Sequence, residues 1–220
     1  MNNKKALILG LLLLVPLLFI VVSGVFDHHF SLRTYFPELT DEGEVVYNAE
    51  GDTIFRQLPD FKLISQEGDT VTQQTFSDDI YVADFFFATC PDVCKKMSSQ
   101  LSRIQEAFES NPDVKIASFT VNPEHDSVEV LQNYAAMYGA KPDKWYFLTG
   151  EKEEIYSLAI KGFFLPVQDL SGEDFVHSEK FMLVDRNRRV RGIYDGTNPV
   201  EVDRLITEIN VLLDEYSKGE

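Results

Sequence analysis

The two cysteines of this 220-residue chain, Cys90 and Cys94, stand four positions apart in the stretch DFFFATCPDVCKKM. Thiols at this spacing can form a structural disulfide, act as a redox couple or supply two ligands to a metal ion. A disulfide between positions i and i+4 closes a very short loop, and short loops gain the least stability from cross-linking. A purely structural bridge is therefore a poor use of this spacing, and the redox and metal-binding interpretations stay open.

The four histidines are the remaining soft-metal ligand candidates. We interpret His28 and His29 as spacer residues at a membrane boundary, and His125, in NPEHDS, as an exposed residue just before a helix. His177, in EDFVHSEKFMLVD, immediately precedes a predicted strand. If that strand lies beside the strand that leads to Cys90, the imidazole of His177 faces the thiols.

The elements around the cysteines predict a strand that turns into a helix. Residues 80–89 form a nearly continuous apolar and aromatic run, which is typical of a central buried strand. Helical spacing of apolar residues follows from Met97 to Phe108. Because a helix N-terminus carries unpaired N–H groups and partial positive charge, we expect it, together with Lys95 and Lys96, to favour the thiolate form of the cysteines.

The rest of the chain predicts an α/β domain. A hairpin is expected over residues 61–74, and Asp126 is expected to cap a helix. Asn198 and Pro199 fit the N-cap and first position of a last helix. Further strands are predicted at 114–121, 145–150, 181–185 and 190–196, and a further helix at 151–160. This alternation predicts a parallel sheet with helices on both faces and an antiparallel final pair, the thioredoxin-like plan. Ligands of such sheets bind beyond the carboxyl ends of strands, where Cys90 lies.

The N-terminus predicts a membrane anchor. Residues 6–26 carry no charge and, as a helix, span about 30 Å, the thickness of the hydrocarbon core. Lys4 and Lys5 place residues 1–5 in the cytoplasm. We therefore expect the chain from residue 27 onward to lie on the other side of a bacterial cytoplasmic membrane, in the periplasm, where disulfides persist. We expect a spacer at 27–53, the domain at 54–216 and a tail at 217–220. A net charge of −16 makes nucleic acid an unfavourable partner.

Several stretches together resemble the Sco/SenC family of membrane-anchored copper-binding proteins, over roughly residues 56–215. The similarity is carried by LPDFKLISQEGDTV, ADFFFATCPDVCKKM, TVNPEHDSVEVLQNYAAMYGAKPDKWYFLTG and VHSEKFMLVDRNRRVRGIYDG. The chain departs from the family pattern at Lys95, where a proline is usual, and at Asn122 and Val176, where aspartate is usual. None of these departures removes a candidate ligand.

The resemblance implies a thioredoxin-like fold and a copper site formed by Cys90, Cys94 and His177. It further implies delivery of Cu(I) or Cu(II) to the CuA centre of cytochrome c oxidase, whose subunit II or another extracytoplasmic thiol protein is the partner. The alternative is an anchored thiol–disulfide reductase, which requires both cysteines and not the histidine. A non-catalytic domain with a stabilising disulfide is the third hypothesis.

Overall fold

The structure is a computed structural model that describes residues 12, 14–15, 31–170, 173–176 and 178–218. The chain divides into two compact units, residues 1–31 and residues 32–220, and the fold described below belongs to the second. Within the described ranges no helix is both long enough and apolar enough to cross a membrane. The predicted anchor at 6–26 falls outside those ranges except for Leu12, Leu14 and Val15.

The second unit alternates strands and helices, as the sequence predicts. In chain order its elements are β1 Lys62–Ser65, β2 Thr70–Thr72, the 3₁₀ turn η1 Gln73–Phe76, β3 Ile80–Phe86, α2 Val93–Ala107, β4 Val114–Thr120, α3 Val128–Met137, β5 Trp145–Thr149, α4 Lys152–Ser157, the π-helical turn η2 Leu158–Gly162, β6 Val167–Leu170, β7 Glu173–Val176, β8 Lys180–Val184, β9 Val190–Asp195 and α5 Pro199–Ser217. The β6–β7 hairpin is an addition to the predicted elements.

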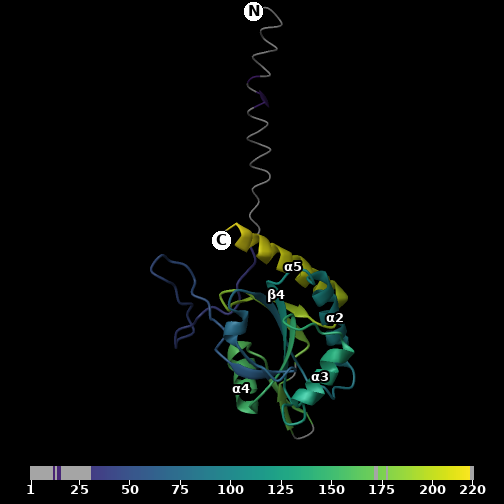
Figure 1. Ribbon diagram of the computed structural model, residues 1–220. Coiled ribbons are helices and arrows are strands. Elements are labelled where there is room, and N and C mark those ends of the chain that lie inside the picture. The colour runs from purple at the N-terminus through teal and green to yellow at the C-terminus, as the bar shows by residue number, and fades with distance from the viewer. Residues whose placement is uncertain (1–11, 13, 16–30, 171–172, 177, 219–220) are drawn as a thin grey trace, which may run out of the picture. The chain divides into compact units, whose positions relative to one another are not determined.

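Seven strands form one mixed sheet in the order β2-β1-β5-β4-β3-β8-β9. Figure 1 shows β4 in this sheet, with α2, α3 and α5 on one side and α4 on the other. Strands β3, β4 and β5 run parallel, with Phe86 of β3 opposite Thr120 of β4. Strand β8 pairs antiparallel with β3, and β9 pairs antiparallel with β8. The predicted parallel core, front hairpin and antiparallel final pair are therefore confirmed, and β3, which leads to the cysteines, is an interior strand between β4 and β8.

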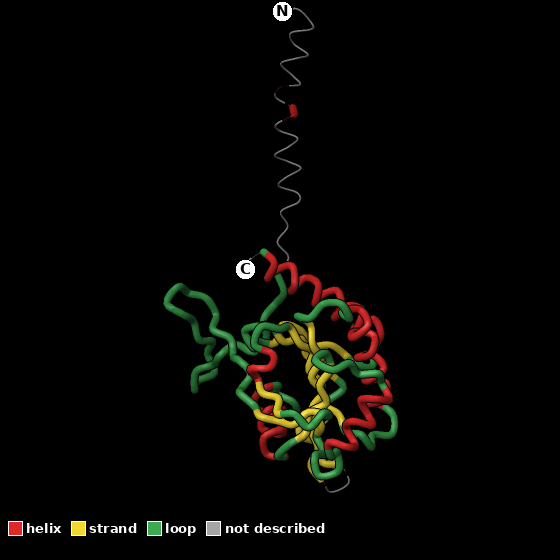
Figure 2. The backbone as a smooth tube through the Cα atoms, in the orientation of Figure 1, coloured by secondary structure: helices red, strands yellow, loops and turns green. Residues whose placement is uncertain are grey.

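Alternate side chains of β3 enter two different cores. Ile80, Val82 and Phe86 face the side covered by helices α2, α3 and α5, whereas Tyr81 and Phe85 face the side covered by α4 and η2. Figure 2 shows these helices in red on the two faces of the yellow sheet. Since residues i and i+2 of a strand share a face, β3 presents apolar side chains to both cores, with Asp84 as the one charged residue on the α2 side.

Part of the predicted spacer packs against the domain. The backbone N–H of Leu32 donates to Glu215 Oε1 at 2.6 Å, and its carbonyl accepts from Arg191 Nη2 at 2.8 Å. Arg191 and Glu215 form a nearly buried ion pair with an N···O distance of 2.8 Å. Residues 37–55 continue as short β-bridges, among them Pro37 with Phe55. The folded unit thus begins at Leu32, earlier than the position 54 expected from sequence.

Candidate thiol and metal site

Cys90 and Cys94 lie where the central strand meets helix α2. Strand β3 ends at Phe86, Cys90 lies in the following loop, and Cys94 is the second residue of α2. The backbone N–H of Cys90 donates to the carbonyl of Phe87 at 3.1 Å, which turns the loop back towards the strand. The structure therefore confirms the predicted strand-to-helix junction at the carboxyl end of the sheet.

The two cysteines contact each other through a helix-capping hydrogen bond. The backbone N–H of Cys94 donates to Cys90 Sγ with an N···S distance of 3.3 Å. The residue before the helix, Asp92, makes no side-chain capping bond. Sulfur thus takes the position that a side-chain oxygen usually holds at a helix N-terminus. Both thiols are free, so the two sulfurs remain available to one ion or to each other.

Burial controls the protonation of Cys94. Cys90 and Cys94 are only 3% and 4% exposed and belong to the core between the sheet and helix α2. Burial raises the pKa of the Cys94 thiol, and the neighbouring Cys90 raises it further, whereas a backbone hydrogen bond at Phe87 opposes this. The expectation that the helix N-terminus favours the thiolate is therefore wrong for Cys94, because desolvation outweighs the helix dipole.

The two lysines after Cys94 also act differently from expectation. Lys96 Nζ lies 2.7 Å from Asp92 Oδ2, and both side chains are exposed. Lys95 is exposed as well. The charge of Lys96 is thus paired with a carboxylate at the surface, where the pair is screened by solvent.

Asp84 is a buried carboxyl group on strand β3, on the side of the sheet that faces helix α2. Because it stands in an apolar run, the sequence pattern does not identify it as a site residue. Asp84 is 1% exposed and accepts a hydrogen bond of 2.5 Å from Ser118 Oγ, which itself accepts from Trp145 Nε1 at 2.9 Å. Burial raises the pKa of Asp84 to about 7, and the hydrogen bond from Ser118 opposes this shift. The charge of Asp84 also contributes to the raised pKa of Cys94.

The expected helix cap Asp126 has another position in the structure. Helix α3 is capped by the next residue, Ser127, whose Oγ accepts from the backbone N–H of Val130 at 3.4 Å. Asp126 is fully buried and accepts from the backbone N–H of Ala88, in the loop that carries Cys90, at 3.0 Å. Its neighbour His125 has a half-exposed side chain at the same end of the sheet, which agrees with the expected exposed position.

The third predicted ligand, His177, lies outside the described residues. In the parts of the chain that are described, no cluster of three or more His, Cys, Asp or Glu side chains is placed to hold a metal ion. Strand β8, which follows His177, does lie beside β3, as the sequence argument required. Its register pairs Met182 with Ala83 antiparallel, so β8 begins near the thiol end of β3.

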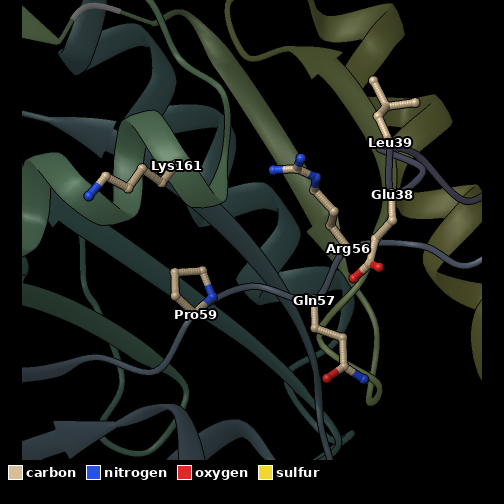
Figure 3. Close-up of a pocket in the computed structure, with 6 residues that line it drawn as sticks. All are labelled: Glu38, Leu39, Arg56, Gln57, Pro59 and Lys161. Carbon is tan, nitrogen blue, oxygen red and sulfur yellow. The ribbon is translucent and has the colours of Figure 1, made fainter. Parts of the chain in front are cut away.

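A separate pocket of about 370 Å³ lies between residues 38–59 and the turn η2 (Figure 3). It is lined by Glu38, Leu39, Arg56, Gln57, Pro59 and Lys161. The Arg56 guanidinium lies 5.3 Å from the ring centre of Phe164, and this cation–π contact orients the Arg56 side chain. Neither cysteine lines this pocket, so the thiol site is a buried junction distinct from it.

The geometry of a dithiol at a strand-to-helix junction, in this sheet order, agrees with the comparison to known proteins. The SCO1/SenC family model matches residues 52–214. The chain belongs to the SCO1/SenC family. The SCO1 protein homolog of Bacillus subtilis (strain 168) is 32% identical over 161 residues, which cover 72% of this chain and 83% of that protein.

Solved structures share the fold. BsSco, described as a member of the Sco family of cytochrome c oxidase assembly proteins with a disulfide switch, is 31% identical with a TM-score of 0.63. The match covers 70% of this chain and 91% of BsSco. Arabidopsis thaliana ScoI, solved with copper bound, has a TM-score of 0.60 at 24% identity, over 70% of this chain and 99% of that one. The domain therefore has the thioredoxin-like α/β fold of Sco proteins.

Proposed function

We propose that this protein binds copper through Cys90, Cys94 and His177 and serves in the assembly of the CuA centre of cytochrome c oxidase. The observation that carries the proposal is the pair of free, buried thiols joined by the 3.3 Å contact from the Cys94 N–H to Cys90 Sγ. This contact keeps the two cysteines next to each other at the junction, where both can ligate one small soft ion, because thiolates select Cu(I) over harder metals. Membership of the SCO1/SenC family supports the same assignment.

The buried thiols also explain how binding would depend on protons. Only the thiolate coordinates a metal, so each cysteine must lose its proton as copper binds. Burial raises the pKa of Cys94 and keeps it protonated in the metal-free protein. Copper affinity is therefore expected to increase with pH, since proton loss becomes easier. The surrounding apolar core excludes water from the sulfurs, which protects Cu(I) from oxidation.

His177 is the proposed third ligand, required mainly for Cu(II). The segment that follows it enters β8 at Lys180, and β8 is the direct neighbour of β3. This topology brings the chain just after His177 to the end of the sheet where Cys90 lies. We further propose that residues 6–26 anchor the protein in a bacterial cytoplasmic membrane with the domain in the periplasm, where subunit II of the oxidase presents its copper site.

The alternative function is thiol–disulfide reduction of the cysteines that will hold copper in the oxidase. In that reaction one thiolate attacks the substrate disulfide and forms a mixed disulfide, and the second cysteine displaces the substrate thiol as the Cys90–Cys94 disulfide forms. Two electrons pass to the substrate, whose two sulfurs each gain a proton. The observation that favours this alternative is that Cys90 and Cys94 are in contact through the hydrogen bond from the Cys94 N–H to Cys90 Sγ, with both thiols free. The small exposure of both thiols disfavours attack on a bulky protein disulfide.

A copper titration of the reduced full-length protein in detergent tests the proposal. Binding would be measured by competition with a Cu(I) chelator and, for Cu(II), by the sulfur-to-copper charge-transfer band. Wild type is expected to bind one copper tightly, and Cys90→Ala, Cys94→Ala and His177→Ala are each expected to weaken Cu(II) binding and remove the band. His125→Ala is the matched control, because His125 is another histidine at the same end of the sheet and is not a proposed ligand.

The two functions predict different results. If His177→Ala binds Cu(II) as tightly as wild type, or wild type binds copper only weakly, the copper assignment fails. If the same preparations reduce a disulfide-bonded peptide with the CuA cysteine spacing, and His177→Ala does so at the wild-type rate, the reductase function takes its place.

A further inference from the structure

The buried carboxylate of Asp126 connects two neighbouring strand ends. Asp126 follows β4, yet its Oδ2 accepts from the backbone N–H of Ala88, in the loop after β3, at 3.0 Å. The same oxygen accepts from Thr120 Oγ1, at the end of β4, at 2.5 Å. Its Oδ1 lies 3.1 Å from His125 Nδ1. Asp126 is 0% exposed, so its carboxylate depends on these donors in place of water.

The contact at Ala88 bears directly on the thiols. Ala88 stands two residues before Cys90, and the intervening chain must place Cys90 Sγ at the N–H of Cys94. A part-buried backbone N–H that loses its acceptor costs free energy, so the contact to Asp126 favours this position of the loop. The carboxylate thus holds the loop at one end, while helix α2 holds it at the other.

We propose that Asp126 is a positioning residue that fixes the thiol loop in the geometry required for copper binding. The inference rests on the proposed function only for its copper readout. Groups that orient metal ligands through hydrogen bonds commonly change metal affinity by about 10–100-fold when they are removed. Asp126 touches neither sulfur, so it acts through the Ala88 backbone and not as a ligand.

The chain offers a matched control next to Asp126. Ser127 caps helix α3, and its Oγ contacts the backbone N–H of Val130 and not the thiol loop. Ser127→Ala therefore weakens the same segment without changing the contact at Ala88. Asp126→Asn is the conservative variant, because its amide can turn the oxygen to Ala88 and Thr120 and the NH₂ group to the imidazole of His125.

The test uses the reduced full-length protein and two readouts. The first is the rate at which iodoacetamide alkylates Cys90 and Cys94 in the absence of metal, and the second is Cu(I) affinity. Asp126→Ala is expected to raise the alkylation rate about tenfold, because the released loop exposes the thiols, and to lower Cu(I) affinity by about 10–100-fold. Asp126→Asn is expected to stay within about threefold of wild type in both readouts, and Ser127→Ala to match wild type.

Several outcomes would overturn the proposal. One is that Asp126→Ala is alkylated at the wild-type rate. Another is that Ser127→Ala raises the alkylation rate as much as Asp126→Ala does. If Asp126→Ala does not fold, Thr120→Val replaces it, because it removes one donor and keeps the side-chain volume. Its alkylation rate is then expected to rise about threefold, and an unchanged rate contradicts the inference. A wild-type protein without copper affinity would refute the proposed function and leave the alkylation comparison valid.

Discussion

Helices α2 and α5 begin in different ways. Helix α5 begins at Pro199 after Asn198, whose Oδ1 accepts from the backbone N–H of Val200 at 3.0 Å. Helix α2 begins at Val93 after Asp92, whose side chain pairs with Lys96 at the surface and makes no capping bond. At this helix start, the backbone N–H of Cys94 donates to Cys90 Sγ instead of to a capping side-chain oxygen.

The difference shows where the chain gives up stability for chemistry. An asparagine followed by proline is among the most favourable helix starts, and it needs no contact from elsewhere in the fold. A thiol sulfur is a much weaker acceptor than an amide oxygen. At α2 the weaker acceptor is a sulfur, which places a reactive atom at the helix N-terminus. The start of α2 therefore positions the thiols, whereas the start of α5 only stabilises its helix.

The largest expected effect comes from exchanging sulfur for oxygen at α2. Cys90→Ser keeps a capping acceptor in nearly the same place, so the free energy of unfolding of the metal-free protein is expected to change by less than about 1 kcal/mol. The hydroxyl is a poor ligand for Cu(I). If one of three ligands supplies about a third of a binding free energy of roughly 10–16 kcal/mol, the range for a structural metal site, affinity falls by roughly 300- to 8,000-fold.

Urea unfolding and Cu(I) competition would measure these two quantities on one preparation. Ser99→Ala, on the exposed side of the same helix, is the control and is expected to bind copper like wild type. A Cys90→Ser protein that retains copper affinity within tenfold of wild type would mean that Cys90 is a cap and not a ligand.

A smaller effect is expected from the carboxyl group in the core next to α2. The pKa of Asp84 is raised from 3.8 in the unfolded reference to about 7 in the folded protein. Between these values the unfolded chain is ionised while the native protein keeps its proton, so stability falls as pH rises from about 4 to about 7 and is level above that. Asp84→Asn cannot ionise and keeps an acceptor for Ser118, so it is expected to be more stable at pH 8 by a few kcal/mol.

The sole tryptophan, Trp145, is fully buried and reports this unfolding by fluorescence. The gain in Asp84→Asn is expected to shrink towards zero at pH 4, because Asp84 is protonated in wild type as well. Asp69→Asn, at an exposed turn position, is expected to leave the pH profile unchanged. An Asp84→Asn protein that is equally stabilised at pH 4 and pH 8 would show that the carboxyl does not titrate in this range.

The sequence predicts those features of the site that depend on local patterns. The buried strand, the helix after it and the neighbouring β8 follow from apolar periodicity and from alternation of elements. Local patterns do not determine which of two adjacent cap-forming residues, Asp126 or Ser127, caps the helix. That choice depends on the donors at Ala88 and Thr120, which only the folded chain brings together.

Features that depend on distant partners were also missed. Asp84 is one charge in an apolar run, and its burial is decided by Ser118 on the neighbouring strand. Residues 32–53 have no sustained period, and Leu32 is held by Glu215, which lies 183 positions away in the chain. Hydrophobic periodicity predicts amphipathic helices and strands. A segment that is held by a buried ion pair and isolated β-bridges has no such periodicity, so the sequence pattern does not predict its packing.

The smallest expected effect sharpens the comparison from the side of α5. Asn198→Ala removes the hydrogen bond to Val200, so the free energy of unfolding is expected to fall by about 1 kcal/mol, which lowers the melting temperature by about 2–4 °C. Asp92→Ala, the matched change at α2, removes no capping bond and only the exposed ion pair with Lys96, so it is expected to lower the melting temperature by less than half as much. Copper affinity is expected to stay at the wild-type value in Asn198→Ala, because the lost hydrogen bond joins Asn198 to Val200 and involves neither cysteine. If Asp92→Ala were as destabilising as Asn198→Ala, the start of α2 would be capped by its carboxylate after all, and the sulfur of Cys90 would not be needed for the N–H of Cys94.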